Sequence, residues 1–250
     1  MISKNKIKLI QSLNLKKNRI EQGLFVAEGP KLVGELMATG QPRYVAAEQT
    51  WMSEHAQQLK GVETDVVTAE ELTRASLQKN PQQVIALFPT LADQTPLAHV
   101  AGNELCLALD GVQDPGNLGT IVRLADWFGI RHIYCSHETA DIYNPKATQA
   151  TMGALARVRV HYMNLTTELA STDAPIYGTH LDGTNIYDHQ LSQHGVLVMG
   201  NEGKGISPQV EQLVSKKLYI PPYPADNQTV ESLNVAIATA IVCAEFRRRK

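Results

Sequence analysis

The chain alternates between short apolar runs and segments in which apolar residues recur every three or four positions. The short runs predict buried strands, and the recurring spacing predicts amphipathic helices. In the first part of the chain, strands are expected directly after Leu24 and at 44–47, 65–67 and 84–88. A short basic helix or arm is expected over 1–20, with helices at 31–40, at 51–60 and after a capping box at 68–71. This alternation predicts a small α/β unit.

From residue 105 onward the runs are more strongly apolar and predict a mostly parallel sheet that is covered on both faces. Strands are expected at 105–109, 133–135, 158–160, 176–179, 196–199 and 218–220, and helices near 117–128, 146–155, 208–214 and 232–249. Residues 89–104 contain two prolines, a glycine and few large apolar side chains, which is typical of a linker. We therefore predict two domains, 1–95 and 103–250.

The overall charge changes this picture little, but its distribution suggests a partner. The formal net charge of the 250 residues is −2, which argues against nucleic-acid binding through overall charge. Both ends of the chain are nevertheless basic, and a local patch is enough to contact RNA phosphates. A solvated helix face and a solvated tail are the alternative. The basic residues are Lys4, Lys6, Lys8, Lys16, Lys17 and Arg19 at the start, and Arg247, Arg248, Arg249 and Lys250 at the end.

The cysteines and the chain start indicate the cytoplasm. Cys106, Cys135 and Cys243 stand in apolar runs without CxxC spacing, so they are expected to be buried thiols in a reducing compartment. The first residues have no apolar signal-peptide core, and no apolar stretch is long enough to span a membrane. Paired-cysteine and HExxH ligand patterns are absent from the sequence, so no metal is expected.

Three segments carry candidate chemistry, and the first is DPGNLGTIVRLADWFG, residues 114–129. Gly116 and Gly119 permit a tight turn after a strand, and Asn117 stands where a helix would be capped. Arg123 lies six residues later on an otherwise apolar helix, and its long side chain is a candidate to reach the same end of the sheet. An exposed arginine on the polar side of the helix, beside Asp126, is an equally good interpretation.

The second segment, LVMGNEGKGIS at residues 197–207, follows a buried strand and contains Gly200, Gly203 and Gly205. It matches neither the GxGxxG nor the GxxxxGK[ST] pattern, so it fits neither of these two phosphate-binding templates, although its glycines allow a ligand to approach the backbone closely. Glu202 is either a solvated charge or a functional carboxylate. In the third segment, residues 219–246, Ser232 and Asn234 stand at the start of an apolar helix, and Ser232 taken alone is a helix N-cap.

In this order and spacing, the three segments resemble the three motifs of the SpoU (TrmH-like) family of RNA ribose methyltransferases, in the SPOUT superfamily. The family pattern NxGxxxR matches 117–123, the (V/M)G(N/S)EGxG loop matches 199–205, and IP followed by SLN matches 220–221 and 232–234. The resemblance covers about 103–250, although the loop between Pro221 and Ser232 is longer than is usual in the family. FVAEGPKLVGE and NPQQVIAL resemble a small ribosomal-protein-like RNA substrate-binding domain.

The resemblance implies an α/β fold with a deep trefoil knot in the C-terminal domain, a homodimer, and S-adenosyl-L-methionine held in the knot. Arg123 would stabilise the developing charge on a ribose 2′-oxygen, or act through the adjacent phosphate. Asn117 and Glu202 would orient Arg123 and the ribose, and Ser232 and Asn234 would shape the pocket. The implied cofactor contacts are Thr179, His180, Met199, Gly200, Gly203, Ile220, Leu233 and Asn234.

Other functions remain open at this point. A non-catalytic RNA-binding homologue would lack the polar motif residues that are present here, and an ordinary nucleotide-dependent enzyme disagrees with the failed loop templates. Base methylation is disfavoured by the NxGxxxR pattern. Ribosomal RNA and transfer RNA are both possible substrates, and the separate N-terminal domain favours ribosomal RNA.

Overall fold

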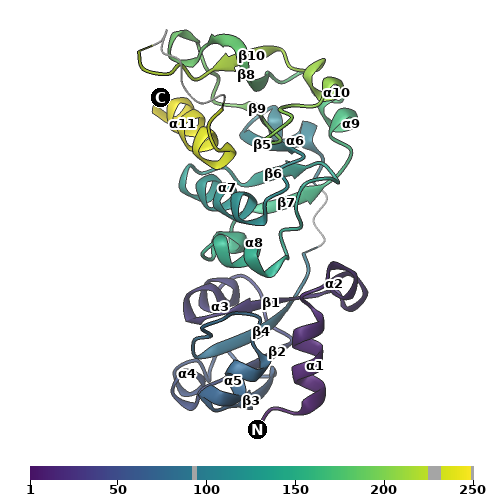
Figure 1. Cartoon of the computed structure of the whole chain (residues 1–250), viewed down its shortest axis with the longest axis vertical. Coiled ribbons are helices and arrows are strands. Elements are labelled where there is room, and N and C mark those ends of the chain that lie inside the picture. The colour runs from purple at the N-terminus through teal and green to yellow at the C-terminus, as the bar shows by residue number, and fades with distance from the viewer. Residues whose placement is uncertain (92–94, 225–231, 249–250) are drawn as a thin grey trace. The chain divides into compact units, whose positions relative to one another are not determined.

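The computed structural model describes residues 1–91, 95–224 and 232–248. The chain divides into two compact units, Met1–Ala92 with Asp141–Arg157, and Asp93–Ala140 with Val158–Lys250. Each unit has its own sheet (Figure 1). The segment 141–157 is grouped with the first unit, and the domain limits 1–95 and 103–250 stay a prediction.

The first unit contains a four-stranded mixed sheet in the order β1-β4-β2-β3. Strand β4 is antiparallel to both of its neighbours, whereas β2 and β3 are parallel. The two inner strands are almost entirely buried because their apolar side chains are covered on both faces. The strands are β1 (Leu24–Glu28), β2 (Tyr44–Ala47), β3 (Glu63–Val66) and β4 (Val84–Pro89).

The helices of the first unit follow the apolar spacing of the sequence. The capping box is confirmed, because the Glu71 amide donates to Thr68 Oγ1 and the Thr68 amide donates to the Glu71 carboxylate. The basic segment at the start forms two helices instead of one. The helices are α1 (Lys4–Ser12), α2 (Lys16–Gln22), α3 (Pro30–Met37), α4 (Gln49–Glu54), α5 (Ala69–Ala75), α8 (Pro145–Ala150) and the short η1 (Ala154–Ala156).

The second unit contains a six-stranded, fully parallel sheet in the order β10-β8-β9-β5-β6-β7, which confirms the predicted α/β class. Strands β5 and β9 are central, and their adjacent ends bring Asp110 opposite Gly200. The strands are β5 (Leu105–Asp110), β6 (His132–Cys135), β7 (Arg159–Tyr162), β8 (Ile176–Asn185), β9 (Gly195–Gly200) and β10 (Lys216–Tyr219). The knotted path implied by the resemblance stays a prediction, since 225–231 lie outside the described residues.

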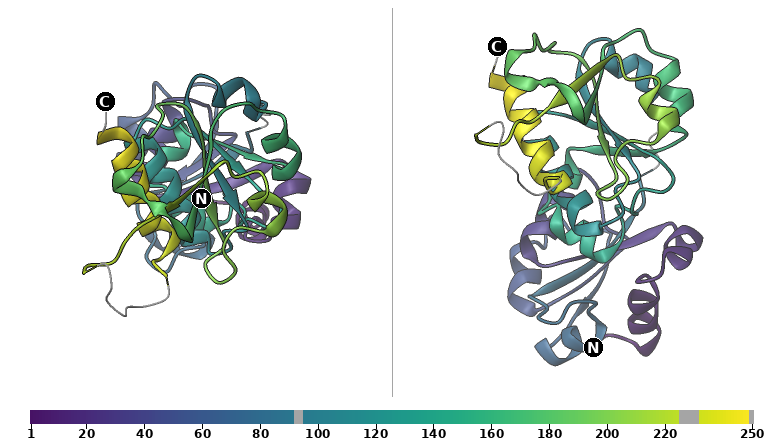
Figure 2. Two further views of the ribbon diagram at one scale, coloured as in Figure 1. Left: turned by 90° about the horizontal axis from the view of Figure 1, so that it is seen from above. Right: turned by 45° about the horizontal axis from the view of Figure 1, so that its top comes forward.

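Helices cover both faces of this sheet, with α7 and α11 on one face and α6, α9 and α10 on the other (Figures 1 and 2). The linker interpretation of 89–104 is wrong for its second half, which forms α6 with Leu97 and Ala101 fully buried in the core. Helix α9 was not predicted either. The bounds are α6 (Leu97–Ala101), α7 (Pro115–Trp127), α9 (Leu165–Ala170), η2 (Ile186–Asp188), α10 (Pro208–Glu211) and α11 (Val235–Arg248).

Strand β8 is longer than predicted because it leaves and rejoins the ladder with β10. Lys217 lies opposite Gly178, but the next residue, Leu218, lies opposite Thr184. Residues 179–183 therefore form an excursion at the carboxyl end of the predicted strand. A Cβ on Gly183 would lie 2.7 Å from the Leu218 carbonyl carbon, so only glycine allows this close return.

The expected burial of the three thiols is confirmed. Burial raises the pKa of the Cys106 and Cys243 thiols to about 12, and it also raises the pKa of Cys135. Within the described ranges, no helix is both long and apolar enough to cross a membrane. The described residues also contain no cluster of three or more His, Cys, Asp or Glu side chains arranged to hold a metal.

Candidate active site

The first motif begins with a capped helix that leaves one amide side chain available. Asp114, not Asn117, is the N-cap of α7: its carboxylate accepts a hydrogen bond from the Asn117 backbone amide at 2.8 Å. Pro115 occupies the first helical position, where its missing N–H costs nothing. The cap predicted at Asn117 is therefore wrong, and the Asn117 side chain can bond elsewhere.

The side chains of all three motifs meet in one chain of hydrogen bonds. Asn117 Nδ2 donates to Glu202 Oε1 at 2.9 Å, and Asn234 Nδ2 donates to Asn117 Oδ1 at 3.1 Å. Since the carboxylate only accepts, the orientation of both amides follows from it. The arrangement connects the start of α7, the loop after β9 and the start of α11.

Asn234 has a second role at the start of α11. Its Oδ1 accepts hydrogen bonds from the backbone amides of Ala236 at 3.0 Å and Ile237 at 3.3 Å. Asn234 therefore caps the helix, and the interpretation of Ser232 as the N-cap is wrong. The cap fixes the Asn234 side chain so that its remaining N–H group faces Asn117.

The loop after β9 is a tight turn that is organised by Asn201. Asn201 and Gly205 exchange two backbone hydrogen bonds of 2.9 Å, and Asn201 Oδ1 accepts from the amides of Gly203 and Lys204. Its Nδ2 donates to the Gly111 carbonyl at 2.7 Å, which ties the loop to the end of β5. A Cβ on Gly200 would lie 2.3 Å from the Gly205 carbonyl carbon. Sequence reasoning missed Asn201 as a site residue, although an asparagine in a glycine-rich loop often bonds its own backbone.

Arg123 and Ser232 are not part of this hydrogen-bonded chain. Both side chains are exposed, and neither forms a hydrogen bond or ion pair with any residue in the described part of the chain. Arg123 lies about 9 Å along the helix axis from Asn117, at 1.5 Å per residue. The structure therefore brings Asn117, Glu202 and Asn234 together and leaves the Arg123 guanidinium exposed to solvent.

The excursion 179–183 places Thr179 and His180 next to the loop after β9. The Thr179 hydroxyl contacts Met199 Sδ at 3.9 Å. His180 Nε2 is buried and has no hydrogen-bond partner among the described residues. Burial, and then the nearby Lys217 charge, lower the pKa of His180, so its neutral form is favoured near pH 7.

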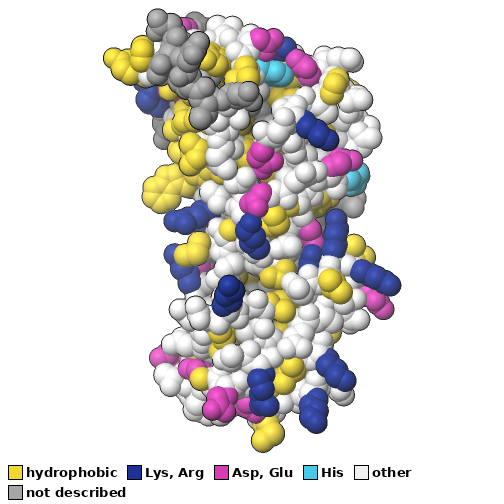
Figure 3. Space-filling view, in the orientation of Figure 1, with side chains coloured by type: hydrophobic (Ala, Val, Ile, Leu, Met, Phe, Trp, Pro, Cys, Tyr) yellow, Lys and Arg dark blue, Asp and Glu magenta, His cyan; other side chains and the backbone are white. Residues whose placement is uncertain are grey.

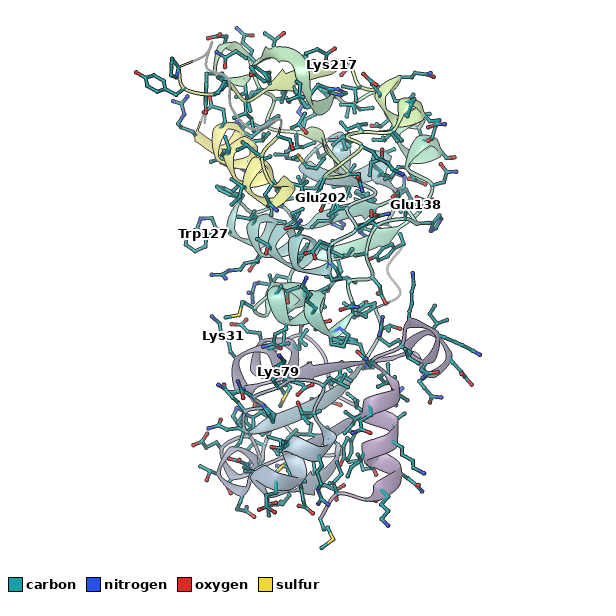
Figure 4. The ribbon with its side chains drawn as sticks, in the orientation of Figure 1. Lys31, Lys79, Trp127, Glu138, Glu202 and Lys217 are labelled. Atoms are coloured by element: carbon teal, nitrogen blue, oxygen red, sulfur yellow. The ribbon has the colours of Figure 1, made fainter. Side chains whose placement is uncertain are left out.

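A charged cluster on the outer side of this excursion holds it in place. Lys217 Nζ donates to Glu211 at 2.6 Å and to Asp182 at 3.3 Å, and both carboxylates lie within 4 Å of His180 Nδ1. The hydrogen bonds from Lys217 lower the pKa of the Asp182 and Glu211 carboxyls. The same bonds, to Glu211 and then Asp182, raise the pKa of Lys217. Lys217 and Glu202 lie in separate parts of the second unit (Figure 4).

The donors around the loop fit S-adenosylmethionine. His180 Nε2, which is buried and has no hydrogen-bond partner among the described residues, is a polar group that a ligand can satisfy. At Gly203 only Asn201 Oδ1, at 3.7 Å, lies near the position that a Cβ would take, so a ligand can approach the backbone there. Met199 is buried, whereas Leu233 is exposed and Ile220 half-buried. Backbone groups beside apolar side chains are the usual lining of a small-molecule site.

A parallel sheet with a tight glycine loop and joined polar motifs at the carboxyl ends of its strands defines an α/β enzyme. Comparison with known families makes this class specific. The model of the SpoU rRNA Methylase family matches residues 104–244, and that of the MRM3-like substrate binding domain matches residues 4–86. The chain belongs to the SpoU rRNA methylase family.

Known proteins resemble the chain over nearly its whole length. The 23S rRNA (guanosine(2553)-2'-O)-methyltransferase RlmP of Bacillus subtilis (strain 168) is 30% identical, over 97% of this chain and 96% of the relative. The structure of AdoMet-bound rRNA methyltransferase from Sinorhizobium meliloti is 29% identical, with a TM-score of 0.88 over 99% of this chain and 96% of that one. A protein from Porphyromonas gingivalis, described as a candidate TrmH-family RNA methyltransferase, is 40% identical, with a TM-score of 0.87 over 100% of both chains.

Fold, motifs and relatives agree on the activity. The chain is an S-adenosylmethionine-dependent RNA methyltransferase that modifies a ribose 2′-hydroxyl.

Proposed function

We propose that the natural substrate is ribosomal RNA of the large subunit. Support comes from the similarity to RlmP, a 23S rRNA methyltransferase, which extends over both units of this chain. The match of 4–86 to a substrate binding domain agrees with this, because that unit would select the RNA. The observation that carries the catalytic part is the hydrogen-bonded chain Asn234–Asn117–Glu202.

Methylation of a ribose requires that a weak nucleophile lose its proton as it attacks. S-adenosylmethionine, when bound, supplies the methyl group. We assign to Arg123 the stabilisation of the developing alkoxide, directly or through the adjacent phosphate, because a guanidinium rarely gives up its proton and serves poorly as a base. Its guanidinium is exposed and has no partner among the described residues, so it is available for such a contact.

The remaining motif residues position the ribose and the cofactor. Asn117 and Glu202 hold each other in one geometry, and Asn234 fixes this pair to α11, so the carboxylate can orient the ribose hydroxyls. Ser232 stands two residues before Asn234 in the chain and would shape the pocket. We propose that the cofactor is held by Thr179, His180, Met199, Gly200, Gly203, Ile220, Leu233 and Asn234.

Fewer basic residues of the N-terminal segment are available for RNA contacts than the sequence suggested. Lys4, Lys8, Lys16 and Lys17 are exposed along α1 and α2, where Figure 3 shows Lys and Arg side chains. Arg19 and Lys6 are removed from this set. Arg19 is 3% exposed, and its guanidinium donates to Asp141 at 2.6 Å and to two backbone carbonyls. Lys6 is half-buried and forms an ion pair with Glu63.

The basic C-terminal tail contributes less than the sequence suggested. Arg247 donates to the Phe128 carbonyl, and Arg248 forms an ion pair with Glu245. Arg249 and Lys250 lie outside the described residues. We therefore place the main phosphate contacts on the four exposed lysines of α1 and α2.

We further propose a cytoplasmic homodimer in which the exposed face of α7 and α11 forms the contact between subunits. Trp127 is 83% exposed and Ile237 is 54% exposed. Trp127 points away from the ribbon of α7 (Figure 4), and large aromatic side chains are typical anchors of interfaces. Light scattering of wild type and Trp127→Ser, with the exposed Tyr223→Ser as control, tests this dimer. A monomeric wild type would contradict it.

The substrate is tested by transfer of tritiated methyl from S-adenosylmethionine to purified 23S rRNA, 16S rRNA and tRNA, followed by nucleoside analysis. We expect a labelled 2′-O-methyl nucleoside in 23S rRNA, and its loss in Arg123→Ala with cofactor affinity unchanged. Labelling of tRNA alone would overturn the proposed substrate. Cofactor binding without transfer to any pool would favour a non-catalytic RNA-binding protein.

A further inference from the structure

A second cleft lies at the carboxyl ends of the parallel strands, beside the loop after β9. Its volume is about 460 Å³, within the usual range of small-ligand sites. Four strand ends contribute to it: Asp110 ends β5 and Gly111 follows it, Glu138 comes after β6, Met163 follows β7 and Asn201 follows β9. Ligands of parallel α/β sheets bind at this edge.

The cleft is separate from the proposed cofactor site but touches the same loop. None of the eight residues assigned to the cofactor lines it, whereas Asn201, Lys204 and Gly205 of the loop after β9 do. The Asn201 side chain is bonded within the loop and to Gly111, so this wall is fixed. A ligand in the cleft would therefore be held beside the catalytic loop without displacing the cofactor.

The lining combines an apolar floor with a rim of unused polar side chains. Leu165 and Val210 are buried in the core beneath the cleft, and Met163 packs against them. The side chains of Glu138, Gln113 and Gln209 form no hydrogen bond or ion pair to any described residue. The basic residues Lys204 and His137, also without such bonds to described residues, complete the rim.

These groups match an unpaired nucleobase that is still attached to its phosphate. Proteins recognise single-stranded RNA by placing splayed bases on apolar or planar surfaces and bonding their edges. Glutamine side chains both donate and accept, and Lys204 is suited to a phosphate. Glu138 is decisive, because a carboxylate only accepts and thus selects a base that presents two adjacent donors. Guanine does so with its N1–H and N2–H₂ groups, whereas uracil offers a single N–H between two carbonyl oxygens.

We infer that this cleft binds an unpaired guanine of the RNA substrate, with Glu138 as the residue that determines the base. The inference rests on the proposed RNA methylation, since it assigns a second contact for the same substrate. Glu138 lines the cleft together with Asn201 and Lys204, which flank Glu202 in the loop after β9, and Figure 4 labels both glutamates in the second unit. One RNA strand is therefore expected to reach both.

The test is saturation-transfer NMR of the full-length protein with guanosine 5′-monophosphate or uridine 5′-monophosphate. S-adenosylhomocysteine is present at saturation to occupy the cofactor site. We expect guanosine monophosphate to bind at least tenfold more tightly than uridine monophosphate, as for a bidentate base contact. Glu138→Gln should remove this preference and lower the affinity for guanosine monophosphate about tenfold. Glu104→Gln, an exposed carboxylate just before β5, is the matched control and should change neither value.

Three results would overturn the inference: no binding of either nucleotide at millimolar concentration, equal affinity for the two, or an unchanged preference in Glu138→Gln. Binding of guanosine monophosphate that appears only when S-adenosylhomocysteine is left out would also overturn it, because the nucleotide would then occupy the cofactor site. The assay involves no methyl transfer. A cleft that does not bind guanine can therefore be distinguished from an error in the proposed function, because the proposed function is tested separately by the transfer of tritiated methyl.

Discussion

Replacing Asn117 by aspartate exchanges the side-chain N–H₂ group for an oxygen at the centre of the hydrogen-bonded motifs. The variant keeps an oxygen that accepts from Asn234 but loses the N–H₂ group that donates to Glu202 Oε1 at 2.9 Å. Two carboxylates then face each other. Folding should be preserved, because the residue is in the first turn of α7, where a negative charge interacts favourably with the helix dipole.

The size of the effect follows from two contributions. A hydrogen bond to a charged group contributes about 1.5–3 kcal/mol. Two unit charges about 3 Å apart repel by about 1.4 kcal/mol at the dielectric constant of water. Because the side chain of Glu202 is exposed, we take the lower end of the hydrogen-bond range and the repulsion calculated for water. The sum of about 3 kcal/mol corresponds to a loss of roughly two powers of ten in kcat/KM, with each factor of ten worth 1.36 kcal/mol.

The assay is initial-rate methyl transfer to the RNA identified above, with Asn117→Asp, Glu202→Gln and the double variant. In the double variant the glutamine amide can donate to the new carboxylate, so part of the activity lost in Asn117→Asp should return. Thermal unfolding of all three should match wild type within a few degrees. Purely additive losses would refute the reasoning, because they would show that the two side chains do not act through their hydrogen bond.

Other parts of the structure give three further expectations. Gly200→Ala should abolish cofactor binding in calorimetry, since its Cβ would meet the Gly205 carbonyl carbon at 2.3 Å, whereas Gly34→Ala, with open space in α3, should stabilise the protein by about 0.5–1 kcal/mol. Arg19→Met should lower the free energy of unfolding in urea by about 3 kcal/mol, because it leaves the Asp141 carboxylate nearly buried and unpaired, yet change RNA affinity less than Lys16→Ala with Lys17→Ala. The pKa of His180 is lowered in the folded state. As pH falls through about 6.5, His180 is therefore protonated in the unfolded chain before it is protonated in the folded one. The stability of wild type relative to His180→Gln should therefore decrease between pH 7.5 and 5.5, and a pH-independent difference would contradict this.

The sequence predicts the elements and the motifs because both depend on local patterns. Strand and helix positions follow from apolar spacing, and the glycine loop is visible in Gly200, Gly203 and Gly205. Helix α6 was not predicted because Pro89 and Pro96 precede its five residues and are typical of a linker. In the structure, Leu97 and Ala101 are buried together. The return of β8 at Gly183 depends on packing against Leu218, a residue far away in sequence, and no local signal marks it.

Hydrogen-bond partners at the site are the least predictable feature. Each motif could be placed after its own strand, but only the sheet order, with β5 beside β9, brings Glu202 to Asn117. The cap at Asp114 could have been predicted from the sequence, since an aspartate precedes a proline at the first helical position. That cap releases the Asn117 side chain for the motif contact.

The spacing between Asn117 and Arg123 in the motif does not place their side chains together. Six residues at about 100° each turn the helix by roughly 600°, so Arg123 projects about 240° around α7 from Asn117. It cannot share the contacts of Asn117, and the structure gives it no partner in the described residues. Trp127, one turn further, is exposed on nearly the same face. If this face joins two subunits, the charge that stabilises the alkoxide lies at the interface, and a dimer-breaking Trp127→Ser should lower kcat while leaving cofactor affinity intact.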